Sequence, residues 1–392
     1  MKPQNLKVTF ALLLSNLFIS FVGIGLVIPV MPTIMNEMNL SGSVMGYMVA
    51  AFAIAQLIVS PIAGKWADKY GRKIMIILGL IIFSISEILF GLGTIVEVLF
   101  ISRILGGVSG AFIMPAVTAF IADITTEKQR SKALGYMSAA INTGFIIGPG
   151  IGGLLAGFGP RIPFFAAAVL AAIAVIISFI FLKEPQRQSI ETTSEKATPQ
   201  LKPGLGRIFA PIYIFAFLLL FFSSFSLASF ESLFSLFVDH KFQFTPTDIA
   251  ILVTGGGLIG AIAQVLLFDH LTRYFGEIKV TLFSFIISAL LVFTMTIVNS
   301  YWTVMITSCI VFVGFDLIRP AITSYLSKVA ENEQGFIGGM NSMFTSLGNI
   351  FGPVIGGILF DINFNFPYYF ATLILLVGII IGLFWKKPNT AL

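Results

Sequence analysis

The sequence predicts an all-α membrane protein in which twelve transmembrane helices form two pseudo-symmetric halves of six helices each. The first observation is composition, because 57% of the residues are hydrophobic and 10% are charged. With a mean hydropathy of +0.98, this lies far outside the range of soluble globular chains. The second is length, because 392 residues at about 20 per spanning helix leave room for roughly twelve spans. The third is an internal repeat.

The repeat joins two glycine-rich stretches inside long apolar segments. The stretch 144–153, GFIIGPGIGG, returns at 348–357 as GNIFGPVIGG. Glycines four residues apart leave one helix face without side chains, so another helix can pack very close to it, and the internal proline bends the helix. One copy alone is compatible with plain helix packing, but two copies in register indicate a duplicated bundle of the kind that secondary transporters use. The residues assigned to these gating helices are Gly144, Gly148, Pro149, Gly152, Gly352 and Pro353.

A second repeat supports the same division. PAVTAF at 115–120 returns as PAITSY at 320–325. Between the halves, the stretch 183–207 has a composition that cannot bury a core, so we expect a flexible cytoplasmic linker there. The predicted domains are therefore the half 1–182, the linker, and the half 208–392.

Apolar runs and the breaks between them predict the individual spans. The first run is too long for a signal peptide and has no small-residue cleavage site after it, so it should remain as the first span. The spans are expected at 8–30, 44–63, 74–94, 97–121, 133–157, 162–182, 209–237, 247–268, 278–298, 301–326, 334–359 and 364–385.

The distribution of positive charge predicts the orientation. If the N-terminus is cytoplasmic, every Lys and Arg lies in a cytoplasmic segment except Arg103, Arg161, Lys241 and Arg319. This is a strong positive-inside signal, so both termini should be cytoplasmic. The net charge of +5 then reports topology and does not indicate a nucleic-acid partner.

Cysteine and histidine usage excludes several classes of function. The chain has one cysteine and two histidines, so neither a disulfide framework nor a metal-ligand cluster can be assembled. We find no catalytic constellation and expect no enzyme, no metal and no cofactor.

Three further motifs carry a family resemblance. The loop GKWADKYGRK at 64–73, with Asp68, Gly71 and Arg72, resembles the cytoplasmic loop signature of the major facilitator superfamily, although Trp stands where Leu is more usual. LFISRILGG at 99–107 resembles the fourth-span motif of that family, whose arginine, here Arg103, is implicated in proton transfer. GLVIPVMP resembles the end of the family's first span.

The resemblance extends over both halves and is most specific for the twelve-span drug/proton antiporters of that superfamily, which include bacterial multidrug exporters. The stretch 144–153 matches the motif that the family associates with antiporters. The resemblance implies the major facilitator fold, a bacterial cell membrane and a monomer. The second-half loop, 269–277, is degenerate, which predicts asymmetric gating.

The charges of the first loop have a simple physical reading. Asp68, just before the third helix, can meet a helix N-terminus favourably, while Lys69, Arg72 and Lys73 stay in cytoplasmic water. The alternative is that these cations only set the topology.

Ionisable residues inside spans are functional candidates because a charge in lipid is costly. The spacing of Asp316 and Arg319 puts them on one helix face within pairing distance. Glu231 has no cation in its own helix turn, so it is our first choice as proton carrier, with Asp316 as partner and as attractor of cationic drugs. The matching acids of related exporters imply the same roles. Glu87 is a weaker rival, because the implied fold places the third span at the periphery. Structural polar contacts are the alternative for all of them.

Uncharged side chains complete the predicted drug site. Gln56 and Asn142 are candidates for the cavity wall, with an interhelical hydrogen bond as the alternative reading. Phe145 and Phe312 neighbour the bent stretch and the charged turn. Aromatic faces and a carboxylate would meet large, lipophilic cations without strict hydrogen-bond geometry.

The sequence thus predicts a proton-driven exporter of lipophilic, often cationic drugs. The resemblance implies quinolone-type antibiotics, dyes and quaternary ammonium compounds as substrates, with the proton gradient in place of a cofactor. The expected partners are these drugs, protons and membrane lipid. A proton-linked carrier for a narrow metabolite and a non-transporting scaffold or sensor remain as alternatives.

Overall fold

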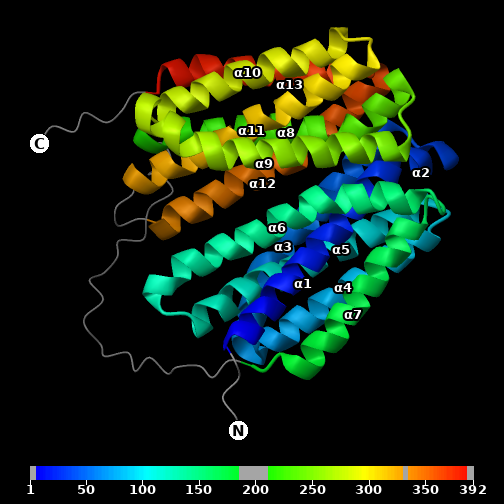
Figure 1. The fold of residues 1–392 in the computed structure, drawn as a ribbon, viewed down its shortest axis with the longest axis vertical. Helices are drawn as coiled ribbons and strands as arrows, with labels where there is room; N and C mark the ends of the chain where they lie inside the picture. The colour runs from blue at the N-terminus through cyan, green and yellow to red at the C-terminus, as the bar shows by residue number, and fades with distance from the viewer. Residues whose placement is uncertain (1–5, 185–210, 330–333, 386–392) are drawn as a thin grey trace, which may run out of the picture. The chain divides into compact units, whose positions relative to one another are not determined.

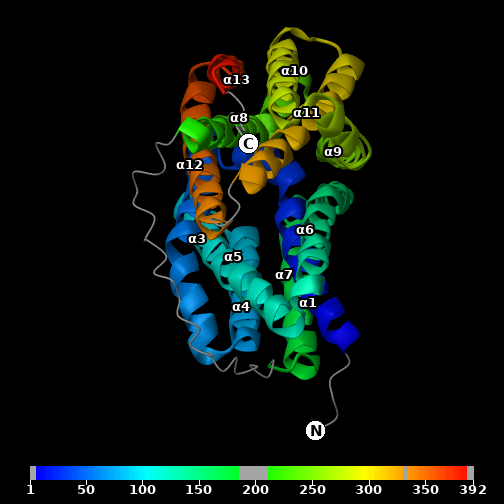
Figure 2. The same cartoon turned by 90° about the vertical axis from the view of Figure 1, so that its left-hand side faces the viewer.

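The computed structural model describes residues 6–184, 211–329 and 334–385, and every regular element in these ranges is helical. Figures 1 and 2 show the helices from two sides. The elements are α1 (Leu6–Val27), η1 (Ile28–Val30), α2 (Met31–Glu37), α3 (Gly42–Tyr70), α4 (Arg72–Leu92), α5 (Val96–Ile124), α6 (Glu127–Ala156), α7 (Ile162–Phe181), α8 (Pro211–Phe242), α9 (Pro246–Phe275), α10 (Glu277–Ile297), α11 (Tyr301–Val329), α12 (Gln334–Ile362) and α13 (Phe366–Leu383).

The described residues contain 12 helical segments that are long and apolar enough to cross a membrane. The first consists of α1, η1 and α2 together. All the predicted spans are confirmed, but α3 and α9 continue about two turns beyond the apolar runs. Hydropathy marks the part of a helix that suits lipid, whereas a helix end needs a backbone break. Gly71 and Gly276, with φ of 106° and 78°, supply that break directly after α3 and α9.

The chain forms two compact units. Unit 1 contains α1, α2, most of α3, α4 to α7 and the first turns of α9. Unit 2 contains the first turns of α3, α8, the remainder of α9 and α10 to α13. The segment 41–47, which was expected in the first half, therefore belongs to unit 2, and the segment 243–254, expected in the second half, belongs to unit 1. Of the predicted linker 183–207, only Lys183 and Glu184 belong to the described residues.

The glycine stripe of α6 lies against α1 in unit 1. A Cβ added at Gly148 would lie 2.7 Å from the carbonyl oxygen of Val22, and one at Gly152 would fall on the carbonyl of Leu26. The two backbones are thus in contact, as the stripe predicts. Figure 1 shows α1 and α6 running side by side.

The repeated stripe of α12 does the same for α8 in unit 2. A Cβ at Gly352 would lie 2.5 Å from the carbonyl oxygen of Phe225, and one at Gly348 would lie 2.6 Å from the amide nitrogen of the same residue. Both copies of the repeat therefore serve as close-packing surfaces for the first helix of their own six-helix set.

A second face of each glycine-rich helix explains the exchanged segments. Gly153 of α6 lies directly against Ala250 in the first turns of α9. A Cβ added at Gly357 of α12 would lie 2.5 Å from the carbonyl oxygen of Gly42. Asp361 of α12 adds a polar link, because its carboxylate accepts the Gly42 N–H at 2.6 Å and the Ser43 N–H at 3.0 Å.

Buried amides find partners between helices. Asn16 donates to Ser178 Oγ at 2.8 Å, and Asn341 donates to Thr323 Oγ1 at 3.1 Å. These bonds meet the requirement that polar groups in a span be satisfied within the protein.

Candidate functional site

Two acidic side chains of unit 2 form the centre of the predicted proton and drug site. Glu231 lies on α8 with an exposed side chain, and Asp316 lies on α11 and is half-buried. The two carboxyl groups are close enough to interact electrostatically. The fold therefore brings two acids that are distant in sequence within range of each other's charge, and two neighbouring negative charges favour the binding of a cation.

An aromatic cluster sets the rotation of α8 and with it the direction of Glu231. Phe230 is 1% exposed. Its ring centroid lies 6.0 Å from that of Phe312 on α11 and 5.7 Å from that of Tyr368 on α13. Successive helix residues project about 100° apart. Burying Phe230 therefore turns the next residue, Glu231, toward the accessible face.

A glycine pair on α9 makes room for the functional turn of α11. The Asp316 carboxylate lies directly against Gly260, and the Phe312 ring lies directly against Gly256. The two glycines are one helical turn apart on α9, and the two side chains are one turn apart on α11. Each side chain therefore fits the space that one glycine leaves. Phe312 is 7% exposed and packs against α9, and its predicted contact with a drug stays a prediction. The sequence signal that was missed is the TGGGLIG stretch, whose glycines match the spacing of these side chains.

Arg319 does not pair with Asp316. Its side chain is exposed, and the ion pairs among the described residues do not include these two. The prediction was wrong because helical spacing brings two Cβ atoms near each other without fixing the directions of their side chains. Here the Asp316 carboxylate is directed to Gly260.

Unit 1 contains a second set of charges inside its spans. The guanidinium carbon of Arg103 lies 4.2 Å from the centre of the Phe90 ring. Its Nε and Nη2 atoms are buried without an acceptor. Glu87 of α4 is 2% exposed and interacts electrostatically with Arg103. Glu87 is thus buried within unit 1, and its place as a weaker candidate for proton coupling stays a prediction.

The uncharged candidates lie on two helices, α3 and α6. Gln56 of α3 is half-buried, and its amide nitrogen lies 2.9 Å from where a Cβ on Gly110 would be. Asn142 of α6 is exposed. Phe145 is 39% exposed, and its ring centroid is 4.8 Å from that of Phe21. Among these, Asn142 and Phe145 present accessible side chains on the helix with the glycine stripe.

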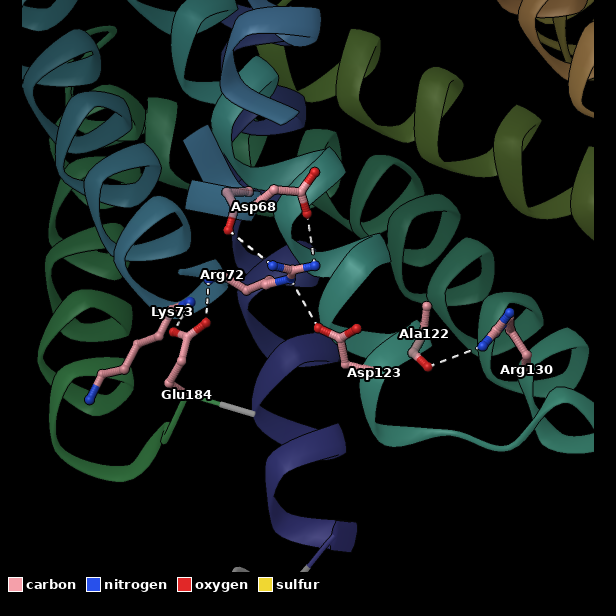
Figure 3. Close-up of polar contacts among 8 residues, drawn as sticks. Asp68, Arg72, Lys73, Ala122, Asp123, Arg130 and Glu184 are labelled. Carbon is pink, nitrogen blue, oxygen red and sulfur yellow. Dashed lines mark hydrogen bonds and ion pairs between the residues drawn. The ribbon is translucent and has the colours of Figure 1, made fainter. Parts of the chain in front are cut away.

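The loop between α3 and α4 is organised around Arg72 (Figure 3). The side chain of Arg72 is 10% exposed and forms ion pairs of 2.9 Å with Asp68 and with Asp123 at the end of α5. It also donates to the carbonyl oxygen of Ala67 at 3.2 Å. We expected Arg72 to stay in water, but the two carboxylates compensate its burial.

Glu184, and not Asp68 as the sequence predicts, lies at the N-terminus of α4. Its Oε1 accepts the Arg72 N–H at 2.5 Å and its Oε2 accepts the Lys73 N–H at 2.9 Å (Figure 3). Asp68 is instead in the last turn of α3, four residues before Arg72, and pairs with its side chain. A Cβ on Gly71 would lie 2.8 Å from the Glu184 carboxyl carbon, so this position requires glycine for space as well as for its φ of 106°.

The corresponding loop of unit 2 carries the same link with the charges reversed. Glu277, at the start of α10, forms an ion pair with Lys328 in the last turn of α11 and accepts a hydrogen bond from Ser324. Arg72 and Asp123 occupy the equivalent places at the start of α4 and the end of α5. The second loop is degenerate as a motif, but the ionic link is present.

The described residues thus form twelve apolar helical segments with charged side chains inside the spans and ion pairs at the loop ends. This arrangement is typical of membrane transporters. The chain belongs to the Major Facilitator Superfamily, whose family model matches residues 13–240 and 216–391.

Curated relatives share nearly the whole chain. "Multidrug resistance protein 1" of Bacillus subtilis is 64% identical, with 97% of each chain covered. "Multidrug resistance protein 2" of the same organism is 53% identical, covering 98% of this chain and 97% of the relative. "Quinolone resistance protein NorA" of Staphylococcus aureus is 45% identical, with 96% of each chain covered.

Solved structures support the fold. A bacterial homologue of the human lysosomal transporter Spinster, in its inward-facing and occupied conformation, matches with a TM-score of 0.83 at 15% identity, covering 99% of this chain and 100% of the other. The nucleoside transporter NupG matches with a TM-score of 0.76 at 15% identity, covering 98% and 100%. The chain is therefore a multi-pass bacterial membrane transporter of the major facilitator fold, and the family confirms that it is not an enzyme.

Gly260→Ala should displace the Asp316 carboxylate, because the added Cβ falls on one of its oxygens. We expect the rate at which a hydrophobic carbodiimide labels Asp316, followed by mass spectrometry, to change several-fold. Gly255→Ala is the matched control on α9, where a Cβ meets nothing within 4 Å. Equal labelling in both variants would show that Gly260 does not position Asp316.

Glu184→Ala should loosen the start of α4, because two amide donors lose their acceptor. The expected destabilisation is about 1 kcal/mol, as for the loss of a helix cap. Hydrogen exchange of the Arg72 and Lys73 amides should become faster, whereas Lys183→Ala, the exposed neighbour, should leave it unchanged. Unaltered exchange in Glu184→Ala would contradict the capping role.

Proposed function

We propose that this transporter exports lipophilic, often cationic compounds from the cell in exchange for protons, by alternating access. Its substrate classes are quinolone-type antibiotics, dyes and quaternary ammonium compounds. The observation that carries the proposal is the electrostatically linked acid pair, Glu231 and Asp316, on two apolar helices of unit 2. Such an acid pair binds either protons or a drug cation, which makes the two mutually exclusive.

The names of the relatives support this substrate range. Two relatives are named multidrug resistance proteins and a third is named a quinolone resistance protein. The high identity over nearly the full length makes the same range the best hypothesis for this chain. Phe145, exposed beside Phe21, supplies the kind of aromatic face that suits flat lipophilic cations.

The transport cycle follows from competition at the acids. A drug from the cytoplasm or the inner leaflet binds near the deprotonated carboxylates. The rocking of the two halves then exposes the site to the outside, where protons displace the drug and permit return. Glu231, the more accessible acid, carries the proton, and Asp316 contributes negative potential. Arg103 takes part in proton coupling from unit 1.

Electrostatics restrict the charge of the substrate. The membrane potential contributes about 2.3 kcal/mol per charge per 100 mV. Exchange of one proton for one monocation moves no net charge across the membrane. The membrane potential drives export only when more than one proton enters for each monocation, or when the exported substrate is neutral. Dications are harder to couple, which makes monocations and neutral amphiphiles the preferred substrates.

The remaining features of the proposal concern setting and assembly. Both termini are cytoplasmic, following the distribution of Lys and Arg. The proton gradient drives transport without a cofactor, and the functional unit is a monomer surrounded by lipid.

The first test is ethidium efflux from energised cells that express the chain, with and without a protonophore. We expect rapid efflux that stops when the proton gradient collapses. Cells without the protein are the control. If ethidium and several other cationic dyes accumulate equally in both, the multidrug proposal fails and a narrow-substrate carrier replaces it.

Glu231→Gln should abolish gradient-driven efflux while ethidium binding to the purified protein is retained, because the amide keeps the shape but cannot exchange a proton. Asp269→Asn, an exposed acid of the α9 end, is the control and should export normally. Undiminished proton-dependent efflux in Glu231→Gln would remove Glu231 from the mechanism.

A further inference from the structure

The acid of unit 1, Glu87, lies at a tightly determined place between α4 and α5. Ser86 Oγ donates to the carbonyl oxygen of Ser102 at 2.8 Å, and Ser102 Oγ donates to the carbonyl oxygen of Ser86 at 2.8 Å. This reciprocal pair of hydrogen bonds fixes the register of α4 and α5. Glu87 follows Ser86 and Arg103 follows Ser102, so this register places Glu87 and Arg103 at the same height along the two helices.

Neither charge has the partner that its burial calls for. Glu87 is 2% exposed and its Oε2 atom is buried without a hydrogen-bond partner. Arg103 has buried Nε and Nη2 atoms that lack an acceptor. The two side chains interact electrostatically, but the ion pairs of the described residues do not join them. A buried ionised group is normally paired or neutralised. A Glu87 carboxylate would have no ion-pair partner in this arrangement, so a protonated, neutral Glu87 fits it better.

Arg103 has a second interaction, with an aromatic ring. Its guanidinium lies over the Phe90 ring at 4.2 Å. Phe90 itself stacks on Phe164 of α7, with ring centroids 4.6 Å apart and an interplanar angle of 15°. The Arg103 guanidinium therefore lies on a buried pair of stacked rings that come from two helices. Arg103 has two competing environments, the ring face and the Glu87 carboxylate.

Among the described residues, the charges on the helices around Glu87 are few. α4 packs against α5, α7 and, to a small extent, α1. α7 has no charged residue, and α1 has Lys7 in its first turn. α5 adds Glu97, which is exposed, and Asp123, which is paired with Arg72. Within the described residues, Arg103 is the charged group that acts on Glu87.

We propose that Glu87 is a second proton-binding residue of the transport cycle, separate from Glu231 and Asp316, and that its proton controls the position of Arg103. With the proton on Glu87, Arg103 rests on Phe90. When the carboxylic acid releases that proton to water, the carboxylate attracts the guanidinium and forms the ion pair. This inference rests on the proposed proton-coupled export, and it places one proton step in unit 1.

The position along α4 suits exchange with one side of the membrane. Glu87 is five residues before the end of α4, which corresponds to roughly 8 Å at 1.5 Å per residue. By the charge distribution of the loops, that end faces the outside. A proton entering from the outside therefore has a short path to the carboxyl.

The test separates net transport from exchange in proteoliposomes that contain the purified full chain. Labelled tetraphenylphosphonium, a lipophilic monocation, is the probe. Accumulation driven by an imposed pH gradient needs proton binding and release, whereas exchange of labelled for unlabelled probe at equal pH does not. For Glu87→Gln we expect gradient-driven accumulation to fall about tenfold and exchange to stay within about twofold of the unmodified protein.

Two further variants complete the comparison. Glu97→Gln removes an exposed acid from α5 and should leave both rates unchanged. Glu87→Asp keeps a carboxyl and should restore a substantial part of the accumulation. If accumulation and exchange fall together in Glu87→Gln, Glu87 is a structural residue. If neither falls, it does not couple protons. Either result overturns the proposal.

A measurement on the unmodified protein keeps the proposal testable if Glu87→Gln does not fold. Hydrophobic carbodiimides react with protonated carboxyls, so mass spectrometry should find Glu87 labelled at low pH and progressively less so as the pH rises. Absence of labelling at every pH at which the protein is folded would overturn the inference. Loss of gradient-driven accumulation in the unmodified protein itself would instead refute the proposed function.

Discussion

Direct contact between helix backbones is the constraint on which the rest of this structure depends. Lipid is as apolar as the helix surfaces, so helices associate through close packing and not through the exclusion of water. The stripe 144–153 lets α1 touch α6, and its copy at 348–357 lets α8 touch α12. Because the two backbones touch along such a surface, the glycine face of each helix must be turned toward its partner, which restricts how that helix is rotated about its axis.

The same packing positions the charged groups. On α9, Gly256 and Gly260 receive Phe312 and Asp316, which determines where the carboxylate of α11 lies. In unit 1, the reciprocal hydrogen bonds between Ser86 and Ser102 position Glu87 and Arg103, the charged residues that follow these serines. The two units share an ancestry in sequence but differ in electrostatics. Unit 2 pairs two acids, which repel, and unit 1 sets an acid near a cation, which attract.

The loops show which property of the repeat is retained. Arg72 with Asp123, and Glu277 with Lys328, link the first residue of one helix to the end of the next in each unit. The signs are reversed between the units while the positions correspond. Coulomb attraction depends on the product of the two charges, so a link can exchange its signs and still hold the helix ends together. This explains how the second loop lost the motif and kept the contact.

The sequence by itself determined the number of spans, the duplication, the glycine stripes, the family and the acids that lie inside the membrane. These properties are local, because hydropathy and glycine spacing are read along one segment at a time. The tertiary structure alone decided that Glu184 caps α4, that Arg319 does not pair with Asp316 and that Glu87 is buried. It also decided that the first turns of α3 and α9 belong to the opposite units. Such contacts join residues far apart in the chain and depend on how each helix is rotated about its axis, which spacing along a single helix does not specify.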